Sequence, residues 1–527
     1  MGLVLSILEP SLSGRAGPQG LNASVAFWTD IAIVCVAGLA FILTLPRAVA
    51  RLGPGGGWSN GHYFRSRGRA RPAKIIQRDS VSSQRYLMGD VRTEVEINID
   101  TYPPPPATSD SVPITRKPVH VKACQARFPF VMRAVRTPTI GRVRLGGVMI
   151  CALYFGVLLY ATLHKSSVFK DPRRAGWVAI SQIPVVYVLA TKNNVLCVAW
   201  GTAYDRISFH MPAAIPYAIA GTVFYGLDRI LRILKTRIVT ATITTIPEMY
   251  STQLAIPQIN AGWRAGQFVR IRVLSGGSGV RGWLVSHPFT IACGGIGEGG
   301  APYGLTLLIK NSGRWTKRLY DVSMAKQRAS DLTTTIQVKV LIEGPYGGFG
   351  YTLPHSFFGA LYVVGGAGIS FGLAGIQEAV QHAQAGTSTL RVVDLVWSVR
   401  HPDCLVPLLP TFSSLLAQAA AANLKLGISV FYTRAVTLDH EFKDYVLPMD
   451  LRLEPGHRRL QNMVQDVVDR TLRTIERGEE LRGVFIGTCG PANLSDPIRE
   501  VIGDLDCTGL SSRVGGIELH EEIFALD

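Results

Sequence analysis

Apolar residues follow one pattern before residue 235 and another after it. Before it, apolar runs with few charges occupy residues 25–45, 145–163, 175–190 and 212–227. The first two have about the 20 residues that a helix needs to cross the hydrocarbon of a bilayer. Pro184 predicts a kink in the third run, which a membrane helix tolerates when neighbouring groups satisfy its backbone. The pattern therefore predicts an α-helical transmembrane region at residues 1–234.

After residue 235 the apolar runs are shorter and of two kinds. TRIVTATITTI, GQFVRIRVL, LTLLIK and TIQVKVLI are rich in β-branched residues and separated by Gly or Pro turns, as in the strands of a small antiparallel barrel. LYVVGG, RVVDLVWSV, KLGISVFYT and GVFIGTCG are continuous apolar runs that alternate with helical stretches, which is typical of buried parallel strands. We predict an antiparallel β-barrel at residues 235–350 and a doubly wound α/β domain at residues 351–527.

Length and charge agree with several domains and a membrane. A chain of 527 residues is too long for one core. Its net charge of +17 is uneven, because residues 46–140 carry 16 Lys/Arg against 6 Asp/Glu. Such a basic loop suits either nucleic acid or the anionic cytoplasmic leaflet, and its place beside an apolar run favours the membrane. We expect no nucleic-acid partner. The eight scattered cysteines contain no CxxC pair, which argues against a disulfide framework or a zinc site.

A glycine-rich turn is the first candidate site. In YVVGGAGISFGLAGIQEAV an apolar strand ends at Gly365, and Gly366, Gly368 and Gly372 open a helix. Small residues let the backbone approach a pyrophosphate, and the helix N-terminus offers free N–H groups. The glycine pattern is weak alone, but the strand before it and the helix after it support dinucleotide binding, and its spacing is often associated with NADPH.

The next strand ends in Arg400 without a carboxylate. An acidic residue there would hold a ribose 2′-hydroxyl, whereas an arginine accommodates the 2′-phosphate of NADPH. Arg434, at the end of VFYTR, is placed to do the same. The alternative for both is a solvated charge at a strand end.

Two further stretches in the barrel carry candidate chemistry. WLVSHPFTIA ends a predicted strand at His287, Pro288, Phe289 and Thr290, and IKNSGRWTKRLY opens a helix with Gly313, Trp315 and Thr316. A helix N-terminus suits a phosphate. From the residues alone, His287 is equally well a turn histidine.

Taken together, HPFT, GRWTKRL, EGPYGG, GGAGIS, LVWSVR and GTCGPANLSD stand in the same order as in the fungal plasma-membrane ferric reductases, relatives of the NADPH oxidase catalytic subunits. The resemblance covers residues 238–522. It implies that FAD is held at His287–Thr290 and, by its pyrophosphate, at Gly313, Trp315 and Thr316. It also implies an NADPH site made of the following residues: Gly344, Pro345, Gly347, Gly366, Gly368, Ser370 and Arg400. Cys489, Gly490 and Pro491 would lie beside the nicotinamide, with Cys489 as the candidate catalytic residue.

The resemblance implies a membrane flavoprotein that passes electrons from NADPH through FAD to a ferric or cupric chelate. NADPH gives up two electrons as a hydride while ferric iron accepts one, and a flavin serves both. The family location is the plasma membrane, with the FAD and NADPH domains in the cytosol. No metal ligand is expected among these site residues.

The membrane region departs from the family pattern. In the family, electrons cross through b-type haems held by histidine pairs on facing helices. Before residue 238 this chain has His62, His120, His164 and His210. Two family-like runs meet at His210–Met211 without the central histidine helices between them. We therefore expect the haem path to be lost and interpret His210 as a remnant of the junction, the alternative being a metal ligand at the mouth of a span.

Three functions remain open from the sequence. The first is a ferric reductase-like oxidoreductase, the second a superoxide-forming NADPH oxidase-like enzyme, and the third a truncated or mispredicted product without function. A haem spectrum separates the third from the others, and the choice of metal chelate or oxygen as acceptor separates the first two.

The number of predicted spans and the charge of the loop predict opposite membrane topologies. With the NADPH domain in the cytosol, four spans would place the basic loop outside the cell, whereas positively charged loops are usually cytosolic. We predict that the basic loop is cytosolic, that the N-terminus is outside, and that residues 212–227 lie at the interface or insert poorly.

Overall fold

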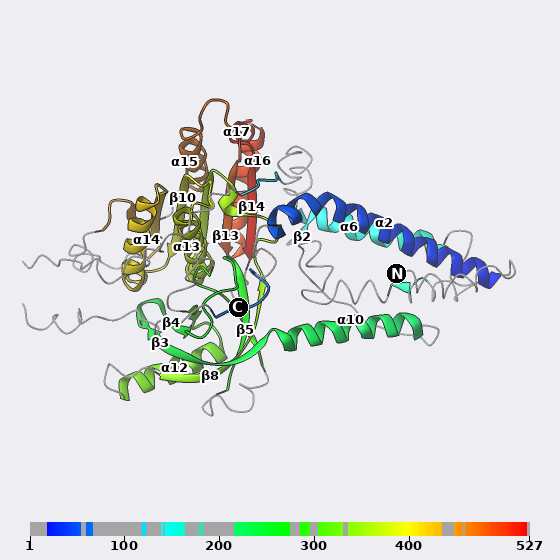
Figure 1. Cartoon of the computed structure of the whole chain (residues 1–527), viewed down its shortest axis with the longest axis horizontal. Helices are drawn as coiled ribbons and strands as arrows, with labels where there is room; N and C mark the ends of the chain where they lie inside the picture. Colours follow the sequence, from blue (N-terminus) through cyan, green and yellow to red (C-terminus); the bar gives the residue numbers. More distant parts are fainter. Residues whose placement is uncertain are drawn as a thin grey trace, which may run out of the picture. The chain divides into compact units, whose positions relative to one another are not determined.

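The computed structural model divides the chain into two compact units (Figure 1). The smaller comprises Met1–Val49 with Val131–Leu234, and the larger comprises Ala50–Phe130 with Lys235–Asp527. The residues that the structure describes are 18–53, 60–66, 118–122, 139–140, 143–163, 178, 181–182, 215–274, 285–295, 304–329, 336–434, 447–456, 459–507 and 509–523. The predicted third run at 175–190 lies mostly outside them, as do His164 and the His210–Met211 junction.

The smaller unit contains helices with outward-facing apolar side chains. α2 (Pro18–Leu52) and α6 (Leu145–Leu163) cover the first two predicted runs. Val36 of α2 and Leu153 of α6 are 70% and 71% exposed. Ile31–Leu52 is long and apolar enough to cross a membrane. α2 continues through Pro46, where the sequence predicts the end of the run.

α10 (Ile215–Leu234) is longer than the predicted run at 212–227. It continues through Asp228, Arg229 and Arg232, and the buried Asp228 carboxylate forms ion pairs with both arginines, at 2.8 Å from Arg232 Nε. Asp228 and Arg232 are four residues apart and share one face, so α10 is amphipathic, whereas α6 is uniformly apolar. Ile233 is nevertheless 71% exposed.

The first half of the larger unit is a nearly closed antiparallel barrel. Its strand order is β6-β5-β8-β3-β4-β7, and a bridge between Ile291 and Leu307 joins the two edges. Side chains of Leu254, Trp263 and Ile342 fill its interior. The strands are β3 (Thr236–Ile246), β4 (Ser251–Ile256), β5 (Gln267–Val273), β6 (His287–Thr290), β7 (Leu305–Lys310) and β8 (Ile336–Gly347). The antiparallel barrel expected from the sequence is confirmed.

The second half is a six-stranded parallel sheet in the order β12-β11-β10-β9-β13-β14. The strands are β9 (Gly359–Gly365), β10 (Val392–Val399), β11 (Lys425–Tyr432), β12 (Leu451–Pro455), β13 (Val484–Gly490) and β14 (Ile517–Ile523). One face is covered by α13 (Ile369–Gln384) and α14 (Leu409–Ala421). The other is covered by α15 (Leu460–Leu472), α16 (Ala492–Cys507) and α17 (Leu510–Val514).

The order of the strands fixes where a ligand binds. β9 comes first in the chain but lies inside the sheet, paired on one side with β10 and on the other with β13. The chain therefore reverses its direction of travel across the sheet between β9 and β13. Open α/β sheets bind ligands at the carboxyl ends of the strands at such a switch point.

A second helix passes the length and composition test for a span, at Pro402–Ala421. It consists of η7 (Pro402–Leu408) followed by α14. Leu405 and Phe412 are completely buried against the parallel sheet, so this helix belongs to the core of the α/β domain.

Parts of the basic loop pack on the larger unit. Phe64 is buried in the barrel core, with its ring 6.3 Å from that of Trp263. Arg65 N donates a hydrogen bond to Ala261 O at 2.7 Å. Farther along the loop, the His120 ring lies edge-on to Phe357 at 4.7 Å. The described segments 60–66 and 118–122 are therefore built into the larger unit.

Candidate functional site

Aromatic rings bring the two barrel motifs together. The His287 ring lies 4.5 Å from the ring of Trp315, and the Phe289 ring stacks on Trp315 at 5.8 Å and 25°. His287 and Phe289 belong to β6, whereas Trp315 lies in the first turn of α12 (Arg314–Ala329). The HPFT strand and the GRWT helix start thus form one surface with partly buried rings.

The start of α12 is arranged to receive an anion. Thr316 Oγ1 accepts hydrogen bonds from the backbone N–H groups of Ser312 and Gly313, at 3.1 and 2.8 Å, and donates to Gly313 O. The first turn of α12 has no acidic residue. A Cβ built on the exposed Gly313 would meet only Thr316 Oγ1, at 3.9 Å, so the backbone is open on that side. Helix N-termini of this kind favour phosphate.

Arg270 of β5 is a functional candidate that the sequence reading missed. It pairs with Pro288 across the strands, and its Nε donates to Ser286 Oγ at 2.9 Å. Burial and the charge of Arg270 lower the pKa of His287, which keeps this imidazole neutral at physiological pH. The sequence alone does not show that Arg270 lies next to HPFT, because this depends on the pairing of β5 with β6.

The glycine turn lies at the switch point of the parallel sheet. Gly366 follows β9 with a φ of +51°, and its carbonyl accepts a hydrogen bond from Trp397 Nε1 at 3.0 Å. A Cβ on Gly368 would lie 2.4 Å from Cys489 O, so no side chain fits there. Ser370 is buried in the first turn of α13. The strand, turn and helix expected from the sequence are all present.

Cys489, Gly490 and Pro491 form the other wall of this site. Cys489 and Gly490 end β13, and a Cβ on Gly365 would lie 3.7 Å from Pro491 Cδ. Burial, and then the charge of Glu522, raise the pKa of the Cys489 thiol to about 12. Cys489 is therefore a neutral thiol at physiological pH and not a thiolate nucleophile.

Lys310 connects the barrel site to the glycine turn. It is the last residue of β7, just before the Ser312–Gly313 turn, and its Nζ would lie 3.7 Å from a Cβ on Gly366. The end of β7 and the glycine turn are thus neighbours in the larger unit. The sequence places these two motifs in separate domains and gives no sign of the contact.

The two strand-end arginines are neighbours. Arg434 N donates to Arg400 O at 3.0 Å, and both side chains are exposed at the ends of β10 and β11. Their closeness gives a doubly positive edge beside the switch point.

The remaining glycines of the predicted NADPH set lie against the barrel. A Cβ on Gly344 would lie 3.3 Å from Val269, and one on Gly347 would lie 3.0 Å from Phe268, both residues of β5. Pro345 lies between these glycines at the end of β8. Their assignment to NADPH stays a prediction.

Comparison with known proteins identifies the barrel. Residues 233–349 match a family described as FAD-binding domain. The chain is 28% identical over 153 residues to ferric/cupric reductase transmembrane component 7 of Saccharomyces cerevisiae, covering 29% of this chain and 21% of that protein. Over this stretch the chain is similar to a ferric/cupric reductase.

Two other relatives match to a similar extent. Ferric reduction oxidase 4 of Arabidopsis thaliana is 30% identical over 154 residues, covering 28% of this chain and 20% of that protein. Probable metalloreductase AIM14 of Candida tropicalis is 31% identical over 146 residues, covering 27% and 22%. The matches thus span about a fifth of the length of these relatives.

Solved structures resemble the chain at low sequence identity. The ferredoxin reductase in carbazole 1,9a-dioxygenase covers 55% of this chain and 70% of its own, at 16% identity and a TM-score of 0.34. A flavohemoglobin from Malassezia yamatoensis covers 72% and 85%, at 12% identity and a TM-score of 0.36.

Proposed function

We propose that the chain is a membrane-bound, FAD-dependent oxidoreductase that takes a hydride from NADPH and delivers electrons to a ferric or cupric chelate. The observation that carries the proposal is the contact between the two sites. Lys310, which just precedes the Ser312–Gly313 turn before α12, reaches the glycine turn at the switch point of the parallel sheet.

The barrel residues fit FAD. The open backbone at Gly313 and the N-terminus of α12 suit its pyrophosphate, Thr316 Oγ1 holds the turn in place, and Arg270 supplies a positive charge on the neighbouring strand. His287, Phe289 and Trp315 provide flat apolar faces for a ring system. FAD, when bound, accepts a hydride and releases electrons singly.

The sheet residues fit NADPH. Gly366 leaves room for the pyrophosphate before the start of α13, Gly368 lets the turn pack directly against Cys489 O, and Lys310 adds a cation from the barrel side. Arg400 and Arg434 suit the 2′-phosphate. The neutral Cys489 thiol shields the reacting region from water without adding charge there.

The acceptor follows from the relatives, whose names describe reduction of ferric or cupric ions.

None of the described residues before 234 supports a histidine pair on facing helices. His62 is packed near Arg51, with a 3.5 Å contact between His62 Nε2 and Arg51 Nη1, in the larger unit. That haem b is not held in the family manner stays a prediction.

The packing of the basic loop supports its cytosolic placement. Segments 60–66 and 118–122 are built into the unit that carries the proposed NADPH site, and NADPH is a cytosolic cofactor. With α2 as a span, the N-terminus then lies outside the cell, and residues 131–234 cross the membrane an even number of times or not at all. The amphipathic α10, which leads directly into β3, suits the membrane interface.

Protease protection tests this topology with tags at residue 1, at residue 90 and at the C-terminus. We expect the tags at residue 90 and at the C-terminus to be protected in intact cells and the tag at residue 1 to be cleaved. Cleavage at residue 90 alongside a protected C-terminus would overturn the placement.

The enzymatic proposal is tested on the full chain purified in detergent. We expect bound FAD, NADPH oxidation with ferricyanide, and slower reduction of a ferric chelate. Superoxide formation in place of chelate reduction would assign the acceptor to oxygen. A folded chain without flavin after incubation with FAD would refute the proposal.

A further inference from the structure

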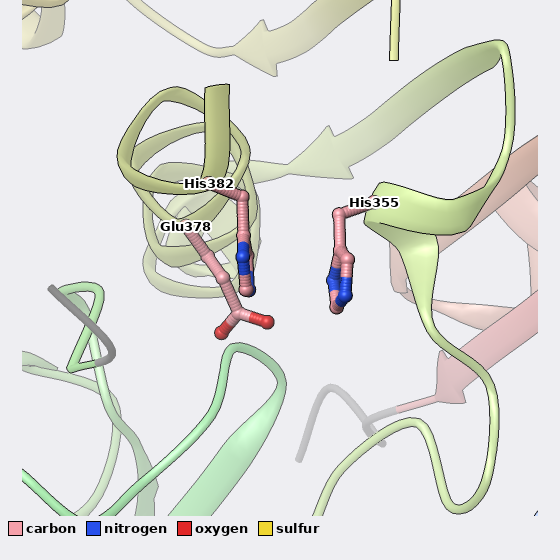
Figure 2. A group of neighbouring side chains, drawn as sticks. All are labelled: His355, Glu378 and His382. Atoms are coloured by element: carbon pink, nitrogen blue, oxygen red, sulfur yellow. The ribbon is translucent and has the colours of Figure 1, made fainter. Parts of the chain in front are cut away.

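Two half-buried histidines and a buried glutamate form a group that is not part of either proposed nucleotide site. His355 belongs to η5 (Pro354–Ser356), in the connection between β8 and β9, and Glu378 and His382 lie four residues apart on α13. One ligand atom from each lies within 4.8 Å of the others. Figure 2 shows the Glu378 and His382 side chains leaving the same helix, with the His355 ring facing them from the opposite loop.

Two of these imidazoles have unsatisfied nitrogens. Nδ1 of His355 and Nε2 of His382 are buried and have no hydrogen-bond partner among the described residues. Buried polar atoms are almost always paired, and an orphan pair in one place points to a missing ligand. His355 and His382 stack with their ring centroids 3.7 Å apart, so both orphan atoms belong to the same small volume.

The hydrogen bond of His382 leaves its free nitrogen as a lone pair. Thr387 Oγ1 lies 2.8 Å from His382 Nδ1 and 3.3 Å from His382 O, so the hydroxyl can donate to the carbonyl while it accepts from Nδ1. With its proton on Nδ1, the ring presents a bare Nε2. Metal-bound histidines are held in this way by a partner on their other nitrogen.

The surroundings of the group decide its charge. Glu378 accepts a hydrogen bond from Ala265 N of the barrel, which fixes its carboxylate. The nearby Arg264 guanidinium donates to the carbonyls of Gly350 and Thr352, at 3.3 and 3.0 Å. Burial raises the pKa of the Glu378 carboxyl, while the Arg264 charge and the hydrogen bond from Ala265 N lower it. A bound cation would favour the ionised carboxylate in the same direction as Arg264.

We propose that His355, Glu378 and His382 bind a divalent first-row transition metal ion, with zinc as the natural probe. Two imidazoles and one carboxylate are a common set of protein ligands for zinc and leave a fourth position for water. Such an ion would tie the loop before β9 to the helix that starts at the glycine turn.

Binding requires a small rearrangement. Ligand atoms around tetrahedral zinc lie about 3.4 Å apart, so the group closes by about an ångström. The ring planes are 20° apart and stacked, so one ring turns about its Cβ–Cγ bond to bring both lone pairs onto the ion. This torsion is soft in histidine.

The test uses the full chain, stripped with a chelator and then dialysed against zinc or cobalt. We expect about one zinc per chain by mass spectrometry, and visible d–d absorption on Co²⁺ addition. His355→Gln and His382→Gln each lower zinc affinity by more than about a hundredfold, and Thr387→Val lowers it by about ten- to a hundredfold. His520→Gln, a half-buried histidine outside the group, leaves zinc binding unchanged.

FAD content, measured on each variant, separates lost metal from lost folding. If a histidine variant fails to fold, Thr387→Val carries the test, since it leaves all three ligands in place. Wild-type chain that retains no zinc and shows no cobalt absorption would overturn the proposal. Equal zinc binding by wild type and His382→Gln would do the same.

Discussion

The two proposed nucleotide sites of the larger unit are built by different means. The barrel site consists of side chains, in which Trp315 joins two other rings and Thr316 fixes a helix start. The sheet site consists mainly of backbone, where Gly368 lies so close to Cys489 O that no Cβ fits. In a site made of side chains, each substitution is expected to lower cofactor affinity in part. In a site made of backbone, a single added Cβ is expected to abolish cofactor binding.

The largest effect is expected for Gly368→Val. Its Cβ would overlap Cys489 O at 2.4 Å, so the turn must move away from the dinucleotide. We expect kcat/KM for NADPH to fall by at least about a hundredfold, or roughly 2.7 kcal/mol. Steady-state kinetics with ferricyanide measures this. Gly156→Ala, where a Cβ meets nothing within 4 Å, is the matched control. A Gly368→Val enzyme with wild-type kinetics would show that the turn does not bind the cofactor.

A smaller effect is expected for Trp315→Ala. Loss of its contacts with His287 and Phe289 removes about 1–3 kcal/mol of the interaction energy that holds the aromatic surface together, since each aromatic pair contributes about 0.5–1.5 kcal/mol. FAD affinity, measured by fluorescence on the flavin-free chain, should fall about ten- to a hundredfold, and Trp315→Phe should recover part of it. An all-or-none loss in both variants would contradict the graded behaviour of this site.

Arg400→Glu tests one of the two arginines that we assign to the edge of the sheet site. A carboxylate would repel the 2′-phosphate, so the KM for NADPH should rise about tenfold while the KM for NADH changes little. Arg477→Glu reverses an exposed charge elsewhere in the α/β domain and serves as the control. Equal changes for both cofactors would remove Arg400 from 2′-phosphate recognition.

The smallest effect concerns Cys489. Because burial raises its pKa to about 12, the thiol stays protonated from pH 6 to pH 10 and contributes no step to the pH profile of turnover. Cys489→Ser should therefore change the rate without changing the shape of that profile. A limb with an apparent pKa of about 8 to 9 in wild type alone would mean that the thiol titrates during turnover.

Much of the fold follows from apolar patterning. The strands with continuous or β-branched apolar runs were predicted, but β4, β12 and β14 were not. β12 and β14 are the edges of the parallel sheet, and their mixed sequences LRLEP and IELHEEI carry no buried-strand pattern. β4 is buried throughout, and its short STQLAI run has too few apolar residues to be recognised.

Contacts between distant segments explain what the sequence did not show of the sites. Local motifs identify Gly366, Gly368 and Thr316, because turns and helix starts depend on neighbouring residues. Lys310 reaches the glycine turn only through the packing of barrel and sheet. The burial of Phe64 in the barrel likewise has no local signal, since it lies in a basic loop far from the barrel in sequence.

The proposed metal site likewise depends on a contact between distant segments. The four-residue spacing of Glu378 and His382 on α13 is visible in the sequence and places both on one helix face. His355 precedes them on a separate segment, and only the fold brings it to the same volume. A search for Glu-x-x-x-His on predicted helices would have found two of the three residues.

An anaerobic titration of the purified full chain with NADPH, followed by flavin absorbance, tests the account most directly. We expect that about one NADPH per flavin bleaches the wild-type chain, and that Gly368→Val holds its flavin without being bleached. Trp315→Ala should lose flavin on dilution yet be bleached by NADPH when FAD is in excess. A wild-type chain whose bound flavin is not reduced by NADPH would contradict the pairing of the two sites.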